Sequence, residues 1–275
     1  MNHRQIANYN QVAAGLPFVG MTVARAFVLF TVTLQAADWL NEGGDAHQRN
    51  VQALERELTP ASVPALKLIW KRKLGEQARL SSPIIMGRLI TFRGTVELVF
   101  VTSSDGHVYA VDGDFGKVFW DRKLDSQSDV CRDPATPALT PNPPDVDPDD
   151  DGEQPKRPLY VLAPDAMLHS LNPIDGKDGA MARPFHCSSA LVVKRSKAAA
   201  LKTRRVARAV TAGGVAFVLI PSTGELQAFD AVTHAALYRS GPTSPTTSAL
   251  AVANGHVCFT ASDAALYCFG FPLDR

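Results

Sequence analysis

The sequence predicts an all-β fold made of small, repeated antiparallel sheets. The first observation is the stretch 99–120, in which short apolar strands are separated by tight turns rich in Asp and Gly. The second is that this pattern returns three more times along the chain. The third is a nearly constant spacing between the copies. Short strands at regular intervals indicate a protein whose copies share one structure.

The spacing is measured from the residue that ends the equivalent strand of each copy. These residues lie 60, 58 and 40 residues apart, and they are Asp112, Asn172, Asp230 and Gly270. Two of the gaps hold insertions, a Pro- and Asp-rich one at 141–157 and a Lys- and Arg-rich one at 191–209. Without them the spacings become 43, 39 and 40. A period near 40 with short strands is typical of a β-propeller blade.

Three motifs of the first copy carry a family resemblance. They are Tyr109-Ala110-Val111-Asp112, Phe115-Gly116-Lys117 and Trp120. Together they resemble the repeat of the pyrroloquinoline quinone (PQQ) enzymes, over roughly residues 38–270. The resemblance implies a blade whose outer strand ends in a Trp that docks on the next blade. The second copy has Ala180-Met181 and the third has Tyr238 at the place of this Trp.

The two ends of the repeat region are each incomplete. Residues 66–74 match the outer strand around Trp120 in register, yet no three strands precede them. The last copy stops at Phe271-Pro272, before its own outer strand. We therefore expect the N-terminal strand to complete the C-terminal blade, which leaves no open sheet edge. This predicts about four PQQ-like blades, at 81–124, 136–185, 210–240 and 246–269 with the N-terminal strand.

The first 37 residues are expected to be a signal or an unstructured segment. After Met21 come a basic residue, the apolar run 26–33 and small residues, a pattern typical of a secretory signal. The run is too short to span a bilayer; the alternative is a buried N-terminal helix or strand. Residues 38–46 resemble the mature start of bacterial secreted proteins with this repeat. We therefore expect one domain over 38–275, periplasmic or secreted.

Residues 59–66 are predicted to form a short helix, with Thr59 as its cap and Pro60 at its first position.

The charge of the chain gives little reason to expect nucleic acid. The formal net charge is +1, so no global positive field is present. Seven Lys and Arg residues do lie within 194–208 without an acidic residue. As a helix they could face phosphate or anionic lipid, but an exposed insertion between blades explains them more simply. No nucleic-acid partner is expected, and no transmembrane span.

One acidic stretch suggests a metal site. Asp147, Asp149 and Asp151 alternate before a Gly, and carboxylates in this arrangement suit calcium. The calcium-binding EF-hand loop also needs a Glu at its twelfth position, which is Pro158 here. The alternative is a solvated acidic loop.

The four cysteines are too far apart in sequence for a zinc site. Cys258 and Cys268 are placed symmetrically about a turn, so on a hairpin they would face each other. They are predicted either to form a disulfide bond or to be two small buried side chains. Cys131 with Cys187 is a second pairing hypothesis.

No catalytic residue emerges from the sequence. The histidines are scattered without metal or catalytic spacing, and no nucleophile motif is present. In the resembled enzymes PQQ lies between a Trp and two adjacent cysteines, beside calcium. No two cysteines are adjacent here, and Trp70 and Trp120 match the docking Trp of the repeat.

The leading functional hypothesis is a non-catalytic scaffold that binds other envelope or secreted proteins. The alternatives are a PQQ-dependent oxidoreductase of alcohols or sugars, and a degenerate propeller without independent activity. The repeat itself specifies how blades pack and carries no catalytic residue.

Overall fold

The chain divides into two compact units, Met1–Leu34 and Gln35–Arg275. The computed structural model describes only residues of the second unit, over the ranges 37–45, 47–91, 94–124, 134–140, 157–165, 167–179, 183–184 and 209–272.

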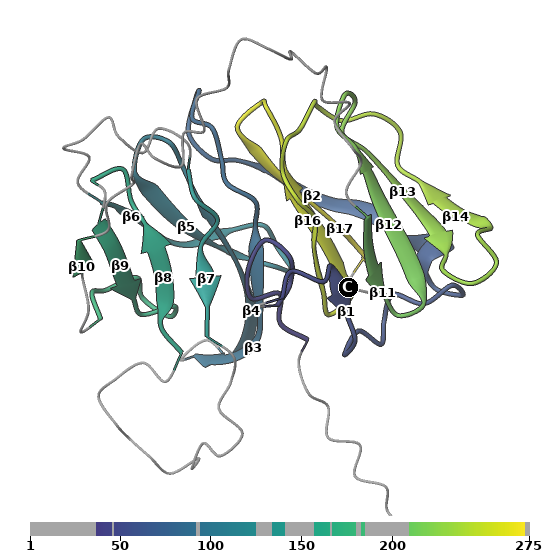
Figure 1. The fold of residues 1–275 in the computed structure, drawn as a ribbon, viewed down its shortest axis with the longest axis horizontal. Helices are drawn as coiled ribbons and strands as arrows, with labels where there is room; N and C mark the ends of the chain where they lie inside the picture. Colours follow the sequence, from purple (N-terminus) through teal and green to yellow (C-terminus); the bar gives the residue numbers. More distant parts are fainter. Residues whose placement is uncertain are drawn as a thin grey trace, which may run out of the picture. The chain divides into compact units, whose positions relative to one another are not determined.

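Within these residues the protein is an all-β propeller chain of four sheets, which we number in blade order (Figure 1). Sheet 1 has the order β3 (Ile84–Thr91), β4 (Gly94–Thr102), β5 (His107–Asp112), β6 (Val118–Lys123). Sheet 2 has the order β7 (Ala138–Leu139), β8 (Leu159–Leu162), β9 (Met167–Leu171), β10 (Arg183–Pro184). Sheet 3 has the order β1 (Val51–Gln52), β11 (Ala209–Ala212), β12 (Val215–Ile220), β13 (Glu225–Asp230), β14 (Ala236–Arg239). Sheet 4 has the order β15 (Ala251–Ala253), β16 (His256–Thr260), β17 (Ala265–Gly270), β2 (Lys67–Lys73).

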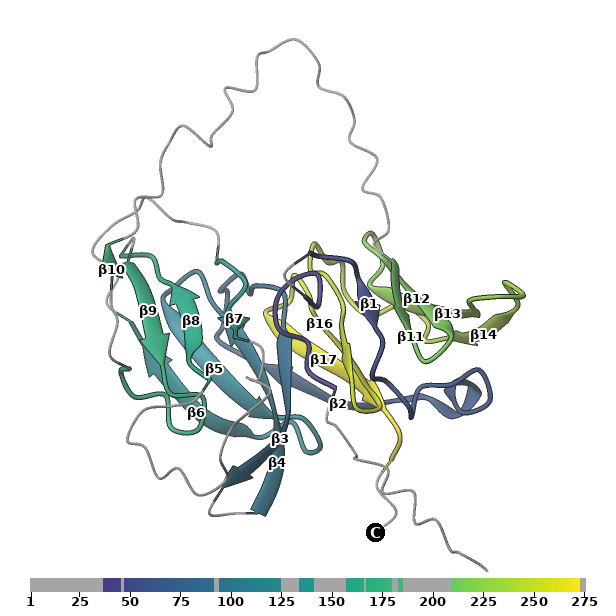
Figure 2. The same cartoon turned by 60° about the horizontal axis from the view of Figure 1, so that its bottom comes forward.

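The predicted sharing of the last blade is confirmed. Strand β2 pairs antiparallel with β17, with Lys73 opposite Ala265 and Trp70 opposite Cys268. Figures 1 and 2 both show β2 beside β17, although the two strands come from opposite ends of the described chain. Sheet 3 differs from the expectation, because β1 adds a fifth strand that runs parallel to β11.

The repeat seen in the sequence has one structural basis, a turn that is built identically in three copies. In each, the amide of the residue four positions after the strand-ending Asp or Asn donates to the carbonyl oxygen of that residue. These pairs are Gly116 to Asp112 at 2.9 Å, Gly176 to Asn172 at 2.8 Å and His234 to Asp230 at 3.0 Å. The residue that donates this bond, Gly116, Gly176 or His234, has a positive φ in each copy, between 59° and 70°. The turn therefore fixes the register of the strand that follows.

Two of these turns are docking sites for a Trp of the neighbouring sheet. The indole of Trp70 lies against Gly116, where an added Cβ would stand 2.6 Å from Cδ2, and its Nε1–H donates to the carbonyl oxygen of Gly113 at 2.6 Å. Trp120 lies against Gly176 in the same way, and its Nε1–H donates to Pro173 at 2.9 Å. Sheet 4 thus docks on sheet 1, and sheet 1 on sheet 2, as the resemblance implies.

The third copy departs from this pattern at both positions. His234 takes the place of the docking glycine, so a side chain begins where the indole approaches in the other two copies. Tyr238 stands at the position equivalent to Trp120. Tyr238 pairs with Ala228 as Trp120 pairs with Ala110, and in both sheets a β-bulge follows the alanine. Its ring meets Phe269 of sheet 4 edge-on, at 6.4 Å between centroids. Sheet 3 therefore packs on sheet 4 through a Tyr.

The helix predicted over 59–66 is wrong in extent. Only Val63–Ala65 form a 3₁₀ turn, η1, and its N-cap is Ser62. The Ser62 amide donates to the Thr59 carbonyl oxygen, three residues back, at 3.1 Å. The Val63 amide donates to the same carbonyl oxygen at 3.0 Å, but Pro64 has no amide hydrogen with which to continue this helical pattern. The next bonds, from Ala65 to Ser62 and from Leu66 to Val63, span three residues.

The disulfide alternative for Cys258 and Cys268 is confirmed. These cysteines are opposite each other on β16 and β17 and are bonded inside the core of sheet 4. Cys131 and Cys187 lie outside the described residues. In the described part of the chain no helix is long and apolar enough to cross a membrane.

Candidate functional site

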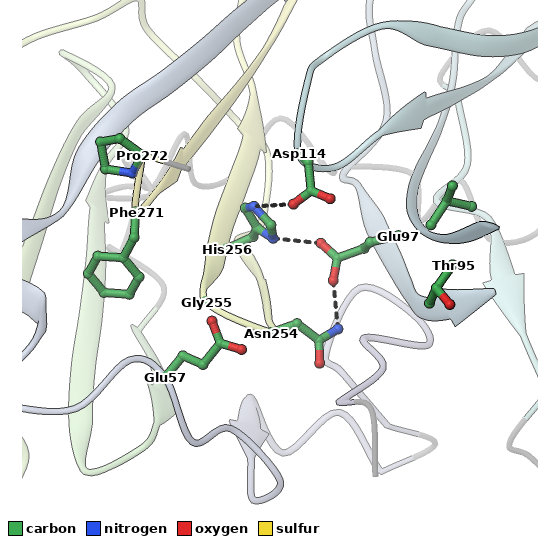
Figure 3. Close-up of a pocket in the computed structure, with 10 residues that line it drawn as sticks. Glu57, Thr95, Glu97, Asp114, Asn254, Gly255, His256, Phe271 and Pro272 are labelled. Atoms are coloured by element: carbon green, nitrogen blue, oxygen red, sulfur yellow. Dashed lines mark hydrogen bonds and ion pairs between the residues drawn. The ribbon is translucent and has the colours of Figure 1, made fainter. Parts of the chain in front are cut away.

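A cavity of about 410 Å³ lies between sheets 1 and 4. It opens beside the start of β4, the turn after β5, and the hairpin between β15 and β16. The hairpin turn is Asn254-Gly255, with positive φ at both residues, which suits a two-residue connection. The residues that line the cavity, most of them labelled in Figure 3, are Glu57, Thr95, Val96, Glu97, Asp114, Asn254, Gly255, His256, Phe271 and Pro272.

The centre of the cavity wall is the imidazole of His256, held between two carboxylates (Figure 3). Its Nδ1 lies 2.7 Å from Oε1 of Glu97, and its Nε2 lies 3.7 Å from Oδ1 of Asp114. His256 belongs to sheet 4, whereas both acids belong to sheet 1. The charged contact therefore joins two sheets as well as lining the cavity.

Asn254 fixes the other oxygen of Glu97. The Asn254 Nδ2 donates to Oε2 of Glu97 at 2.6 Å and to the carbonyl oxygen of Ala37 at 2.8 Å. Its Oδ1 accepts from the amide of Ala37 at 2.8 Å. One side chain thus ties the first described residue of the chain to the cavity, and it leaves Glu97 little freedom to rotate.

Burial and charge shift the pKa values of this pair. The Glu97 side chain is 8% exposed, and burial raises its pKa. Burial by itself lowers the pKa of His256, but the hydrogen bond and charge of Glu97, with the charges of Asp114 and Glu57, raise it by more. The acids around His256 therefore favour its protonated form, against the effect of burial.

A third carboxylate lies across the cavity. Oε2 of Glu57 lies over Gly255, where an added Cβ would be only 2.5 Å from it (Figure 3). Glu57 and Asp114 add negative charge beside the pair of Glu97 and His256, which leaves an excess of negative charge. Among the described residues that line the cavity there is no Lys or Arg. The cavity is suited to a positively charged group.

The same arrangement argues against two other kinds of chemistry. No group of three or more His, Cys, Asp or Glu side chains in the described ranges could hold a metal ion. Both nitrogens of His256 already face carboxylates, so neither points at a hydroxyl or thiol that it could activate.

The site residues predicted from sequence lie elsewhere. Asp147, Asp149 and Asp151, the predicted calcium ligands, lie outside the described residues, as does most of the basic insertion at 191–209. Sequence reasoning missed the cavity residues. One signal was available, because Glu97 interrupts an otherwise apolar strand, and a charged residue in such a run is buried only with a partner.

The residues of the cavity do not fit PQQ. This cofactor carries three carboxylates, which the acids of the wall would repel. Trp39 is fully buried in the core, and Trp70 and Trp120 lie over glycines of neighbouring sheets, so none of them lines the cavity. Cys258 and Cys268 are bonded across two strands rather than between adjacent residues.

No protein-family model matches the chain, and no curated protein matches it. Among solved structures, it is similar to part of the quinohemoprotein alcohol dehydrogenase of Comamonas testosteroni, with a TM-score of 0.38 and 17% identity, over 74% of this chain and 27% of that one. It is similar to the quinohemoprotein alcohol dehydrogenase ADHIIG of Pseudomonas putida HK5, with a TM-score of 0.39 and 17% identity, over 76% and 27%.

A europium-containing methanol dehydrogenase gives a TM-score of 0.38 and 13% identity, over 76% of this chain and 32% of that one. The chain thus spans about a third or less of the length of these dehydrogenases. At such identities and TM-scores, neither their cofactor nor their reaction is transferred to this protein.

Proposed function

We propose that this protein is a non-catalytic binding module, in which propeller blades present an acidic cavity that holds a positively charged group of a partner. The observation that carries the proposal is the cavity wall formed by Glu57, Glu97 and Asp114 around His256, without a Lys or Arg among the described lining residues. A cation placed there would offset the excess negative charge and would meet carboxylate oxygens as hydrogen-bond acceptors.

The position of the cavity supports a binding role. It lies where two sheets meet, and such junctions are common places for ligand sites. Its volume of about 410 Å³ is large enough to hold a charged side chain. The bonds of Asn254 and His256 to Glu97 hold the wall in place before a ligand arrives, which lowers the ordering cost of binding.

We also propose that the protein works outside the cytoplasm, in the periplasm or as a secreted protein. Support comes from the disulfide between Cys258 and Cys268, because such bonds persist in oxidising compartments. The apolar run at 26–33 would serve as the core of an export signal. The partners would then be other envelope or secreted proteins.

The proposal is tested by titrating the full chain with N-acetyl-arginine amide and recording amide chemical shifts by NMR. The expected result is a saturable shift of the amides of Thr95 and Gly255. N-acetyl-glutamine amide, which is neutral, should leave them in place. The variant Glu57→Gln should weaken the arginine response, whereas Glu76→Gln, on an exposed turn away from the cavity, should not.

Two results would contradict this function. The first is the absence of any saturable shift with N-acetyl-arginine amide. The second is saturable binding of PQQ with calcium that is accompanied by dye reduction with an alcohol or a sugar, because the cavity chemistry argues against that cofactor.

A further inference from the structure

The acidic cavity does not end at His256. A second hollow, of about 240 Å³, adjoins it and shares four of its residues, which are Asp114, His256, Phe271 and Pro272. The remaining residues of the second hollow come from strand β2 and from the turn after β5, and they are Lys67, Leu68, Ile69 and Phe115. The two hollows together form an extended groove along the junction of sheets 1 and 4.

The second hollow is open, and its lining combines charged side chains with a group of apolar ones. Phe115 is 53% exposed and Leu68 is 44% exposed, and they are among the few large hydrophobic side chains on the described surface. Two such side chains beside the ring of Phe271 make a small apolar wall next to a charged cavity. Exposed apolar surface rimmed by charge is characteristic of interaction sites.

The charged residues of the two hollows indicate which chemical group of a ligand each hollow would favour. Glu57 and Glu97 line only the first cavity, so a cation is favoured there. Lys67 lines only the second hollow and offsets the charge of the shared Asp114, so this hollow has no excess of acids and offers apolar side chains instead. The occupant therefore needs a positive group and an apolar group on one short, flexible frame. A peptide with a basic residue beside an aromatic or large aliphatic one provides both.

The exposure of the groove favours a peptide over a free metabolite. Small-molecule sites enclose most of the ligand surface, whereas Thr95, Phe115 and Pro272 leave this groove open to solvent. A side chain on a partner protein does not need such enclosure, because the rest of the partner remains outside the groove.

We propose that this groove docks an exposed segment of a partner protein, with an Arg or Lys side chain in the acidic cavity and a neighbouring aromatic or large aliphatic side chain against Leu68 and Phe115. This inference rests on the proposed function, which supplies the cation site, and adds the apolar subsite and the peptide nature of the ligand.

The test uses capped tetrapeptides with the central pairs Arg-Phe, Phe-Arg, Arg-Ala and Gln-Phe, measured against the full chain by calorimetry or NMR. The better of the Arg-Phe and Phe-Arg peptides should bind about five- to tenfold more tightly than Arg-Ala, because an aromatic ring is partly removed from water. It should also bind more tightly than Gln-Phe, and this preference should weaken as salt is added.

Matched variants separate the two subsites. Phe115→Ser should abolish the advantage of Phe over Ala in the peptide but keep the advantage of Arg over Gln. Val232→Ser removes an even more exposed apolar side chain, 84% exposed and in sheet 3, and should change neither. Phe115 is half-exposed on a turn, so its replacement should leave folding intact, and circular dichroism checks this.

Each outcome decides one of the two claims. If the Arg-Phe, Phe-Arg and Arg-Ala peptides bind equally, or if Phe115→Ser has no effect, the apolar subsite is refuted while the cation site stands. If N-acetyl-arginine amide and all Arg peptides fail to bind, the cation site and the proposed function are both refuted. If the single amino-acid amide binds as tightly as the best tetrapeptide, the occupant is a small amine or guanidinium compound and the peptide assignment is overturned.

Discussion

The docking of Trp70 on the turn at Gly116 can be tested with a single methyl group. Gly116 has φ of 64°, a conformation that costs an alanine about 1–2 kcal/mol. The added Cβ of Gly116→Ala would also stand 2.6, 2.7 and 2.9 Å from three atoms of the Trp70 ring, closer than real Cβ atoms approach. Overpacking of this kind costs about 1–3 kcal/mol. We expect Gly116→Ala to lower the free energy of unfolding by about 2–5 kcal/mol.

The matched control is Gly241→Ala. Gly241 has φ of 73°, but no atom lies within 4 Å of an added Cβ. This variant therefore carries the backbone cost alone, about 1–2 kcal/mol. Chemical denaturation of both variants, followed by Trp fluorescence and circular dichroism, gives the steric part as the difference between them.

Two results would refute the docking argument. One is a Gly116→Ala variant that is no less stable than Gly241→Ala. The other comes from a double-mutant cycle with Trp70→Leu, in which a smaller side chain should accept the new methyl group. If the losses in unfolding free energy of Gly116→Ala and Trp70→Leu are additive in the double mutant, the two residues do not interact.

Four further predictions follow from the described contacts. Replacing Cys258 and Cys268 by Ala should lower the free energy of unfolding by about 3 kcal/mol, because the disulfide closes a loop whose ends are 10 residues apart and so limits the entropy of the unfolded chain. Added reductant should not change the stability of this variant. Glu97→Gln should lower the pKa of His256, measured by NMR titration, because burial remains while the partner charge is gone. Since the folded pKa of His256 is raised above its usual 6.5, its stabilisation of the wild-type protein should be complete below about pH 6.5 and disappear as pH rises through the folded value; a free energy of unfolding that rises over this interval would contradict it. Trp39→Ala should cost about 3–5 kcal/mol because the ring is fully buried, and Trp39→Phe should cost clearly less in the same denaturation assay.

Much of the fold could be predicted from sequence because it depends on local patterns. Alternating apolar residues make strands, and an Asp or Asn followed four residues later by a residue with positive φ makes the repeated turn. Even the pairing of β2 with β17 could be inferred, since the outer strand around Trp70 copies the one around Trp120 in register. The helix expected after Thr59 failed for a local reason, because Pro64 has no amide hydrogen to donate to the Pro60 carbonyl oxygen.

What the sequence by itself determined is therefore the blade: its strands, its turns, its period and the residues that mark its outer strand. What only the tertiary structure decided is the cavity. Asn254 and Glu97 are 157 residues apart and belong to different sheets, yet they share a hydrogen bond of 2.6 Å. No strand periodicity encodes such a contact, because it depends on how two sheets pack once a Trp has docked. Scattered acids and one histidine, each ordinary in its own segment, become a charged site only when that packing brings them together around one cavity.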